Sequence, residues 1–190
     1  QREDVTAIYH ASLRMLALIN QMLDLSRTDA GQLQFAREPV YLAQVVEQVR
    51  EDIAPQALAK GLTLQLDVSG SLPPAAGDTE RVRQILLNLA SNAVKFTPAG
   101  TVRIRAGVTN TGVMEIEVSD TGIGISADAL PHIFTEFYRD EPRLSRQHEG
   151  VGLGLAIARK LATQMGGSIQ VWSVQGVGST FRVYLPLWQP

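Results

Sequence analysis

Residues 87–96 read LNLASNAVKF, a helical pattern that sets two amide side chains beside an apolar stripe. Asn88 and Asn92 lie four positions apart and therefore share one helix face, and Lys95 follows one turn later. Polar groups next to a buried Leu89 need hydrogen-bonding partners. Two interpretations are open: surface or capping amides, or oxygen ligands for a Mg²⁺ ion, with Lys95 as a point charge for the phosphate that the ion carries.

The stretch DTGIGI at residues 120–125 follows directly on an alternating strand pattern. In isolation this motif is most often a glycine turn after an edge strand. The alternative is that the glycines leave backbone room beside a purine base, and that Asp120 accepts a hydrogen bond from an adenine amino group. Such a carboxylate discriminates well, because a buried polar group left unpaired costs about 1–3 kcal/mol, and more when it is charged.

The stretch GVGLGLAIA at residues 150–158 places three glycines before an amphipathic helix. Its spacing is GxGxG rather than GxGxxG, and the polar residues 143–149 before it do not form a strand pattern, so a dinucleotide-binding turn is excluded. The sequence also has no GxxxxGK[ST] loop. What remains is a glycine hinge that leads into a helix N-terminus, where free N–H groups and the helix dipole favour phosphate.

Residues 133–139, IFTEFYR, are followed by a polar segment at 139–149 with almost no apolar side chain. One interpretation of this segment is a solvated loop. The other is a lid over the nucleotide, with Phe134 and Phe137 as its apolar anchor and Arg139 reaching the terminal phosphate.

Together with GVGSTF at residues 176–181, these stretches resemble in order and spacing the N, G1, F, G2 and G3 boxes of the sensor histidine kinases of two-component systems. Those kinases share their ATP-binding fold, the Bergerat-type fold, with the gyrase, heat-shock chaperone and MutL ATPases. The resemblance spans residues 33–187 and implies ATP and Mg²⁺ as ligands. It implies that Asn92 coordinates the metal, that Asn88, Lys95 and Arg139 act on the phosphates in catalysis, and that Thr180 helps to hold Asp120. The nucleotide-binding residues that it implies are Asn88, Asn92, Lys95, Asp120, Gly122, Gly124, Ile125, Phe137, Tyr138, Arg139, Gly150, Val151, Gly152, Leu153, Gly154, Leu155 and Thr180.

Alternation and helical spacing along the rest of the chain predict an α+β fold, a two-layer α/β sandwich of a mixed, mostly antiparallel sheet under three helices. The predicted helices are 41–56, ending near Pro55 and Gly61, one that Asp78 caps and that ends before Pro98, and 153–164. The predicted strands are 32–35, 62–68, 102–106, 114–118, 168–174 and 181–185.

Residues 4–28 predict a long helix that belongs to a bundle, because its apolar positions alternate at spacings of three and four and cover much of its circumference. We therefore expect two domains: residues 1–31, the incomplete second helix of a dimerisation and phosphotransfer bundle, and residues 32–190, the ATP-binding catalytic domain. A homodimer through this helix is expected.

None of the three histidines fits the phosphoacceptor box of the family, which resembles HExxxP on a helix. His10 is followed by Ala11 and has no proline nearby, and glycines follow His148 and Glu149. His132 is expected to pack with the 133–139 stretch. The chain opens at Gln1, so we expect a piece of a longer protein, with the acceptor histidine outside this chain and no autophosphorylation by it. The other expected partner is the receiver domain of a response regulator.

Composition restricts the remaining function classes. The 190 residues are 45% hydrophobic and 19% charged, with a net charge of −2, which gives no electrostatic footprint for nucleic acid. No cysteine is present, so disulfides and thiolate metal sites are excluded, and a soluble, cytoplasmic location is expected. Two rival functions stay open: an ATP-hydrolysing clamp, which carries a water-activating glutamate where this chain has Asn88, and a degenerate nucleotide-binding scaffold.

Overall fold

The structure is a computed structural model, and it describes residues 12, 15, 36–139 and 151–189. The chain divides into two compact units, Gln1–Gln34 and Phe35–Pro190. Ser12 and Met15 are helical. The rest of the expected 4–28 helix and the expected 32–35 strand lie outside the described residues, and the boundary between residues 31 and 32 stays a prediction.

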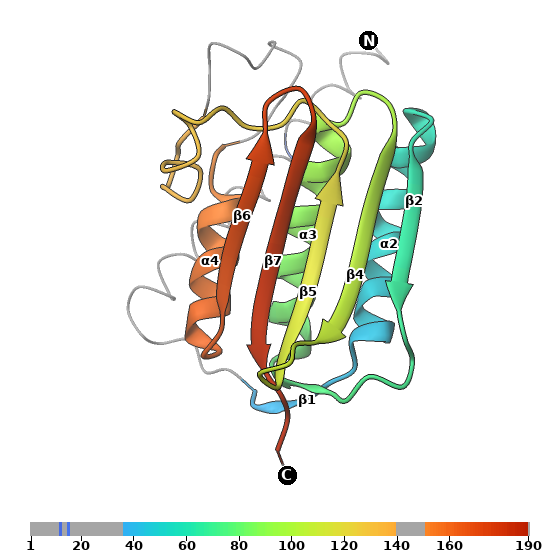
Figure 1. Cartoon of the computed structure of the whole chain (residues 1–190), viewed down its shortest axis with the longest axis vertical. Helices are drawn as coiled ribbons and strands as arrows, with labels where there is room; N and C mark the ends of the chain where they lie inside the picture. Colours follow the sequence, from blue (N-terminus) through green and yellow to red (C-terminus); the bar gives the residue numbers. More distant parts are fainter. Residues whose placement is uncertain (1–11, 13–14, 16–35, 140–150, 190) are drawn as a thin grey trace. The chain divides into compact units, whose positions relative to one another are not determined.

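The second unit is built on a five-stranded sheet in the order β2-β4-β5-β7-β6 (Figure 1). β2 pairs with β4 in parallel, and the other neighbours are antiparallel. The strands are β2 Thr63–Val68, β4 Thr101–Val108, β5 Val113–Asp120, β6 Ser168–Val174 and β7 Gly178–Pro186. This mixed, mostly antiparallel sheet confirms the predicted α+β fold.

Three helices, α2 Leu42–Ala59, α3 Thr79–Phe96 and α4 Gly154–Gln164, lie on one face of the sheet (Figure 1). Side chains alternate between the two faces of a strand, and on β5 the buried Met114, Ile116 and Val118 point toward the helices. The charged Glu115 and Glu117 therefore lie on the opposite face, which we call the outer face. None of the described helices is long and apolar enough to cross a membrane.

α2 corrects one predicted boundary, because the helix continues through Pro55 as far as Ala59. Proline has no N–H to donate to the carbonyl of Glu51 four residues earlier. Both residues are exposed, so water can satisfy that carbonyl and the helix tolerates the missing bond. The chain leaves the helix through Gly61, which has a φ of 66°.

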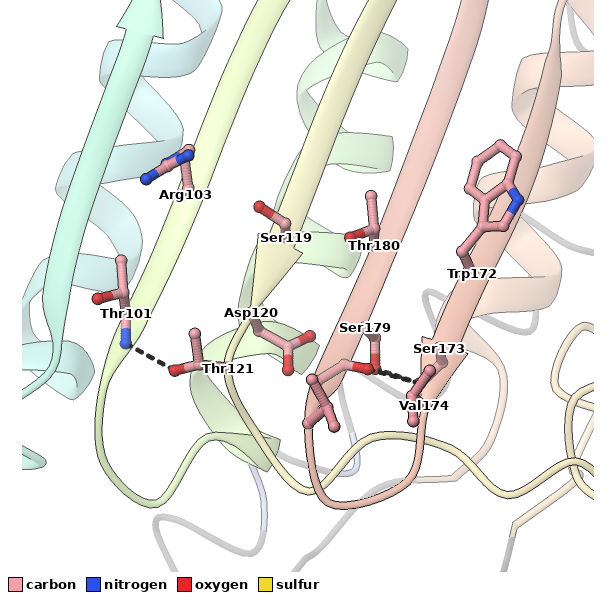
Figure 2. Close-up of a pocket in the computed structure, with 12 residues that line it drawn as sticks. Thr101, Arg103, Ser119, Asp120, Thr121, Trp172, Ser173, Val174, Ser179 and Thr180 are labelled. Atoms are coloured by element: carbon pink, nitrogen blue, oxygen red, sulfur yellow. Dashed lines mark hydrogen bonds between the residues drawn. The ribbon is translucent and has the colours of Figure 1, made fainter.

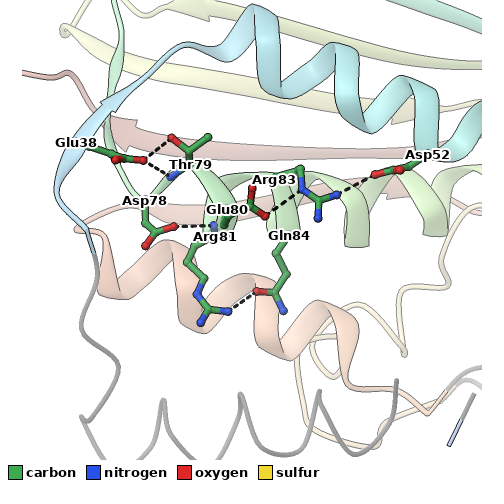
Figure 3. A network of polar contacts seen from close by, with 8 residues as sticks. All are labelled: Glu38, Asp52, Asp78, Thr79, Glu80, Arg81, Arg83 and Gln84. Carbon is green, nitrogen blue, oxygen red and sulfur yellow. Dashed lines mark hydrogen bonds and ion pairs between the residues drawn. The ribbon is translucent and has the colours of Figure 1, made fainter. Parts of the chain in front are cut away.

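A short sheet of β1 Glu38–Val40 and β3 Ala75–Gly77 brings two carboxylates to the first turn of α3. The Asp78 carboxylate accepts hydrogen bonds from Arg81 N at 3.1 Å and from Ala36 N at 3.2 Å, which confirms the predicted cap. The Glu38 carboxylate accepts from the N–H and the hydroxyl of Thr79 at 3.2 and 2.6 Å (Figure 3). Both carboxylates satisfy orphan donors and complement the positive end of the helix dipole.

The other end of α3 is fixed by a lysine from α2's C-terminus. The Lys60 ammonium donates to the carbonyl oxygens of Val94 and Lys95 at 2.8 and 2.7 Å. A cation there satisfies terminal carbonyls and complements the negative end of the dipole. The helix that carries Asn88 and Asn92 is therefore held at both ends.

Replacing the Asp78 cap tests this clamp. Asp78→Ala should lower the free energy of unfolding by about 1–2 kcal/mol, because it leaves the N–H groups of Arg81 and Ala36 without their acceptor. Urea denaturation measures the change. The matched control is Asp67→Ala, whose carboxylate is 79% exposed and lies 3.9 Å from Arg105, and which should change stability by less than about 0.5 kcal/mol. Equal losses in the two variants would contradict the assignment.

Candidate nucleotide-binding site

Asp120 is the last residue of β5, and its side chain has the same strand parity as Met114, Ile116 and Val118, so it points to the helix side of the sheet. Its Oδ1 accepts a hydrogen bond from Gly122 N at 2.8 Å. Ser179 lies directly opposite in the β5–β7 register, and its N–H and hydroxyl act to lower the pKa of the Asp120 carboxyl. The carboxylate is thus half-buried, with a hydrogen bond from Gly122 and with Ser179 beside it.

Ser179, and not Thr180, lies on the Asp120 face of the sheet, so the structure does not bring Thr180 to Asp120 as expected. The buried residues of β7 are Phe181, Val183 and Leu185, so Ser179 shares their face and Thr180 points the other way. Figure 2 draws Thr180 beside Ser119 on the outer face. The physical reason is the period of two residues in a strand: a shift by one position moves a side chain to the opposite face.

Burial raises the pKa of the Asp120 carboxyl above the ordinary aspartate value. Desolvation disfavours the ionised form, and the hydrogen bonds from Gly122 and Ser179 oppose that effect only in part. A buried carboxylate whose pKa is raised in this way is an acceptor that gains from one further donor. The exocyclic amino group of a base is a donor of that kind.

Two close backbone approaches fix the loop that follows Asp120. Gly124 has a φ of 64°, and a Cβ on it would overlap the carbonyl of Val174. Gly178 has a φ of 140°, and a Cβ on it would overlap the Asp120 carbonyl. Glycine is therefore required at both positions, and the loop and the β6–β7 hairpin pack backbone against backbone.

The Asp120 loop is also tied to α3 and to the hairpin by main-chain hydrogen bonds. Ile123 N donates to the Phe96 carbonyl at 3.1 Å, and Gly176 N donates to the Ile123 carbonyl at 2.8 Å. Ile125 N donates to the Ser173 hydroxyl at 2.8 Å. Strand β5, the C-terminus of α3 and the β6–β7 hairpin thus meet at one end of the sheet.

The amide of Asn88 joins α3 to the start of α4. Asn88 Nδ2 donates to the Gly154 carbonyl at 3.1 Å. Asn92, one turn further along α3, is half-buried, and its side chain has no hydrogen-bonding partner among the described residues. A half-buried amide without an internal partner is suited to an external ligand. Lys95 is half-buried, with Nζ 4.9 Å from the Phe96 ring centroid.

The N-terminus of α4 presents backbone donors. Leu153 is the N-cap residue, and no side chain caps the helix. The Leu153 side chain is itself only 1% exposed, so this residue can offer a ligand its backbone alone. Val151, Gly152, Gly154 and Leu155 are half-buried around it, whereas Gly150 lies outside the described residues. Uncapped N–H groups at a helix N-terminus suit an anionic phosphate.

Phe134 anchors the 133–139 stretch as expected, but Phe137 does not. Phe134 packs edge-on against Phe181, at 6.4 Å between ring centroids, and the Arg159 guanidinium lies 5.2 Å from its ring. Phe137 is 53% exposed, which corrects its expected role as an apolar anchor. Phe137 has a positive φ of 62°, which is uncommon for a residue other than glycine. The backbone is the held part of this residue, because its N–H donates to the Gly152 carbonyl at 3.1 Å.

Further contacts hold the same stretch against its neighbours. Glu136 accepts a hydrogen bond from Lys160 of α4 at 2.7 Å. The His132 ring lies 5.5 Å from the Tyr138 ring, as expected for a histidine that packs with this stretch. Arg139 is exposed at the end of the described segment.

A shallow hollow lies on the outer face, at the same end of the sheet (Figure 2). Arg103, Ser119 and Trp172 contribute side chains to it. Asp120 and Ser179 also line the hollow, whereas Asn88, Asn92 and the start of α4 lie on the helix side, so the hollow holds only part of the site that the sequence motifs predict. Within the described ranges, no three acidic, histidine or cysteine side chains cluster as a metal centre would require.

Ser173, Ser179 and Lys60 are the site and support residues that sequence reasoning missed. For Ser179 a signal was present, since the inward parity of Phe181, Val183 and Leu185 extends to position 179. For Ser173 the same parity follows from Ile169 and Val171 on β6. For Lys60 no local pattern signals a contact, because its acceptors lie more than thirty residues away in sequence.

Comparison with known proteins places this chain in a family. Residues 77–189 match the family described as histidine kinase-, DNA gyrase B-, and HSP90-like ATPase. The chain is 40% identical over 190 residues to the circadian input-output histidine kinase CikA of Synechococcus elongatus, and 36% identical over 192 residues to the signal transduction histidine-protein kinase BarA of Escherichia coli. Each alignment covers 98% of this chain, but only 25% of CikA and 21% of BarA.

A solved structure agrees with these relatives. Full-length ShkA in complex with AMPPNP superposes with a TM-score of 0.88 at 37% identity, and covers 100% of this chain and 39% of the ShkA chain. The chain therefore belongs to the histidine kinase-, DNA gyrase B- and HSP90-like ATPases, and its ATP-binding domain is that of a sensor histidine kinase.

Proposed function

We propose that the Phe35–Pro190 unit binds Mg·ATP and transfers the γ-phosphoryl group to a histidine on a separate helical segment, for onward transfer to a response regulator. The observation that carries this proposal is the half-buried carboxylate of Asp120, held by Gly122 and Ser179 at the end of β5. Its remaining acceptor capacity suits the amino group of adenine. ShkA, a relative of the same fold, is solved with the nucleotide AMPPNP.

The phosphates would extend from Asp120 toward α3 and the start of α4. The uncapped N–H groups at Leu153 and Gly154 suit an anion, and Lys95 and Arg139 supply positive charge to phosphate oxygens. Phosphoryl transfer depends on alignment and charge stabilisation more than on covalent catalysis by the protein. These roles of Lys95 and Arg139 rest on the resemblance of their motifs.

A magnesium ion fits the residues that are present. Mg²⁺ prefers hard oxygen ligands and usually keeps several waters alongside substrate phosphates, so it needs few protein ligands. The half-buried Asn92 amide, which has no partner among the described residues, would supply one oxygen. Bound there, the ion would neutralise charge on the phosphates.

The geometry of Asn88 disfavours the rival clamp ATPase. Asn88 Nδ2 donates to the Gly154 carbonyl at 3.1 Å. A carboxylate is acceptor-only when ionised, so a glutamate base could not make this contact. An amide cannot activate water by taking its proton, and rapid hydrolysis is not expected from it.

The partners of the longer protein follow from the relatives' names and from the sequence. We propose that the helix predicted at residues 4–28 associates two chains and that the acceptor histidine docks as a substrate. The receiver domain of a response regulator then takes the phosphoryl group. A chain without cysteine that uses ATP suits the cytoplasm.

Nucleotide should stabilise the chain. At a Mg·ATP concentration about 100 times Kd, the free energy of unfolding should rise by about 2.7 kcal/mol, because the ligand binds the folded state. Thermal unfolding with and without Mg·ATP measures the gain. An unchanged melting temperature at saturating Mg·ATP or Mg·ADP would sink the proposal, and a gain that persists without Mg²⁺ would remove the metal from it.

The raised pKa of Asp120 should make ATP binding depend on pH. The ionised carboxylate can accept a hydrogen bond from the amino group on either oxygen, whereas protonation turns one oxygen into a donor. ATP affinity should therefore fall as the pH drops through the pKa of Asp120, which lies above the ordinary value of about 3.9. Asp120→Asn should lose about ten- to hundredfold in ATP affinity and show no such pH dependence. Binding titrations from pH 7 downward measure both.

Stability should respond in the opposite direction. Because folding raises the Asp120 pKa, this group's own contribution to stability is present at low pH and lost as the pH rises through the folded pKa. As the pH rises, the ligand-free parent should therefore lose unfolding free energy relative to ligand-free Asp120→Asn. A difference that moves the other way would show that burial does not dominate this carboxyl.

Binding and self-phosphorylation should separate. His10, His132 and His148 each lack the combination of an acidic neighbour and a following proline, so γ-labelled ATP should leave no acid-labile label on this chain. A helical fragment with the family's histidine box should become labelled when it is added. Stoichiometric acid-labile label on the chain alone, lost in His10→Ala, would show that the N-terminal helix carries the acceptor.

A further inference from the structure

The hydroxyl of Ser173 on β6 stands between three backbone segments that surround Asp120. It accepts a hydrogen bond from Ile125 N at 2.8 Å and donates to the Gly178 carbonyl at 2.8 Å. Its oxygen also lies 3.1 Å from the Ser179 hydroxyl (Figure 2). One side chain thus joins the loop after Asp120, the β6–β7 turn and the residue that holds Asp120.

The number of protons on each hydroxyl decides which group donates and which accepts in these contacts. A serine hydroxyl has one proton and can accept two hydrogen bonds. Because the Ser173 proton goes to the Gly178 carbonyl, the Ser179 hydroxyl is the donor whenever the two hydroxyls bond. Ser179 in turn lies directly opposite Asp120 in the β5–β7 register, so the residue that Ser173 contacts is the one beside the carboxylate. The Ser173 oxygen therefore influences where the Ser179 hydroxyl points.

No other side chain described in the structure makes these links. The remaining ties between the loop and the hairpin are main-chain contacts, such as Gly176 N to the Ile123 carbonyl at 2.8 Å. Those contacts place the backbone, but they do not orient the Ser179 hydroxyl. Ser173 does both, since it holds Ile125 N and contacts Ser179.

We propose that Ser173 is a positioning residue for base recognition, which acts through Ser179 and the Ile125 backbone to orient the Asp120 carboxylate toward the adenine amino group. This proposal rests on the proposed ATP-binding function. Ser173 need not touch the nucleotide. Its loss should loosen the carboxylate and leave Ile125 N and the Gly178 carbonyl without their partner, so selectivity should fall more than affinity for the phosphates.

Inosine triphosphate isolates this effect, because it carries an oxygen where ATP carries the amino group. The experiment measures Kd for Mg·ATP and for Mg·inosine triphosphate in the full chain and in three variants. Ser173→Ala removes the hydroxyl, and Ser173→Thr keeps it. Ser168→Ala is the matched control at the start of the same strand, on an exposed side chain with no hydrogen bond among the described residues.

Selectivity is the Kd for Mg·inosine triphosphate divided by the Kd for Mg·ATP. This ratio should fall about three- to tenfold in Ser173→Ala, return toward the parent value in Ser173→Thr, and stay unchanged in Ser168→Ala. An unchanged ratio in Ser173→Ala, with only a lower melting temperature, would overturn the positioning role. If Ser173→Ala does not fold, Ser173→Cys takes its place, because a thiol is a poor donor and acceptor. A ratio equal to the parent's in that folded variant overturns the role too.

A second comparison tests the route through Ser179. Adding Ser173→Ala to Ser179→Ala should change the ratio less than Ser173→Ala does in the parent, because the Ser173–Ser179 contact is already broken and the contacts to Ile125 N and the Gly178 carbonyl are what is left to lose. Fully additive effects would overturn that route. If the unaltered chain binds neither triphosphate, the proposed function itself fails. If the unaltered chain selects ATP and Ser173→Ala selects it equally well, only the positioning role of Ser173 fails.

Discussion

The close approach of the Asp120 loop to the β6–β7 hairpin is the constraint on which the site depends. A side chain at Gly124 or Gly178 would overlap the carbonyl of Val174 or of Asp120, so the two backbones can meet only where glycine stands. Asp120 is half-buried where the two backbones meet, and burial raises the pKa of its carboxyl. The backbone contact, the half-buried carboxylate and its hydrogen bond from Gly122 thus lie together at one end of the sheet.

The two-layer architecture brings the parts proposed to face the phosphates to the same region. α3 is capped by Asp78 and Glu38 at one end and by Lys60 at the other, so its amide-bearing face has a fixed position. The Asn88 contact to the Gly154 carbonyl then sets the start of α4 beside that face. Helix ends, which leave backbone groups unpaired, thereby become the parts of the fold that can address an anion.

Periodic patterns along the sequence predicted most of the strands and the helix cap. Alternation identified β4, β5, β6 and β7, and the Asp78 cap followed from its position before an apolar helix. Thr180 lies one residue before the predicted 181–185 strand. The observed β7 begins at Gly178, and its alternation puts Ser179, not Thr180, on the Asp120 face. Phe137 could not be placed in this way, because its positive φ is a property of the folded chain and not of a local pattern. The run of α2 through Pro55 depends on the exposure of Glu51, and the contacts of Ser173 and Lys60 join residues distant in sequence.

Backbone amide chemical shifts, recorded while Mg·ATP is added, test the central claim most directly because they locate the nucleotide on one side of the sheet. The account predicts the largest changes at Gly122, Ile125 and Gly154, on the helix side, with Arg103 and Trp172 in the outer hollow nearly unchanged. Large changes at Arg103 and Trp172, with Gly122 and Gly154 unaffected, would contradict it.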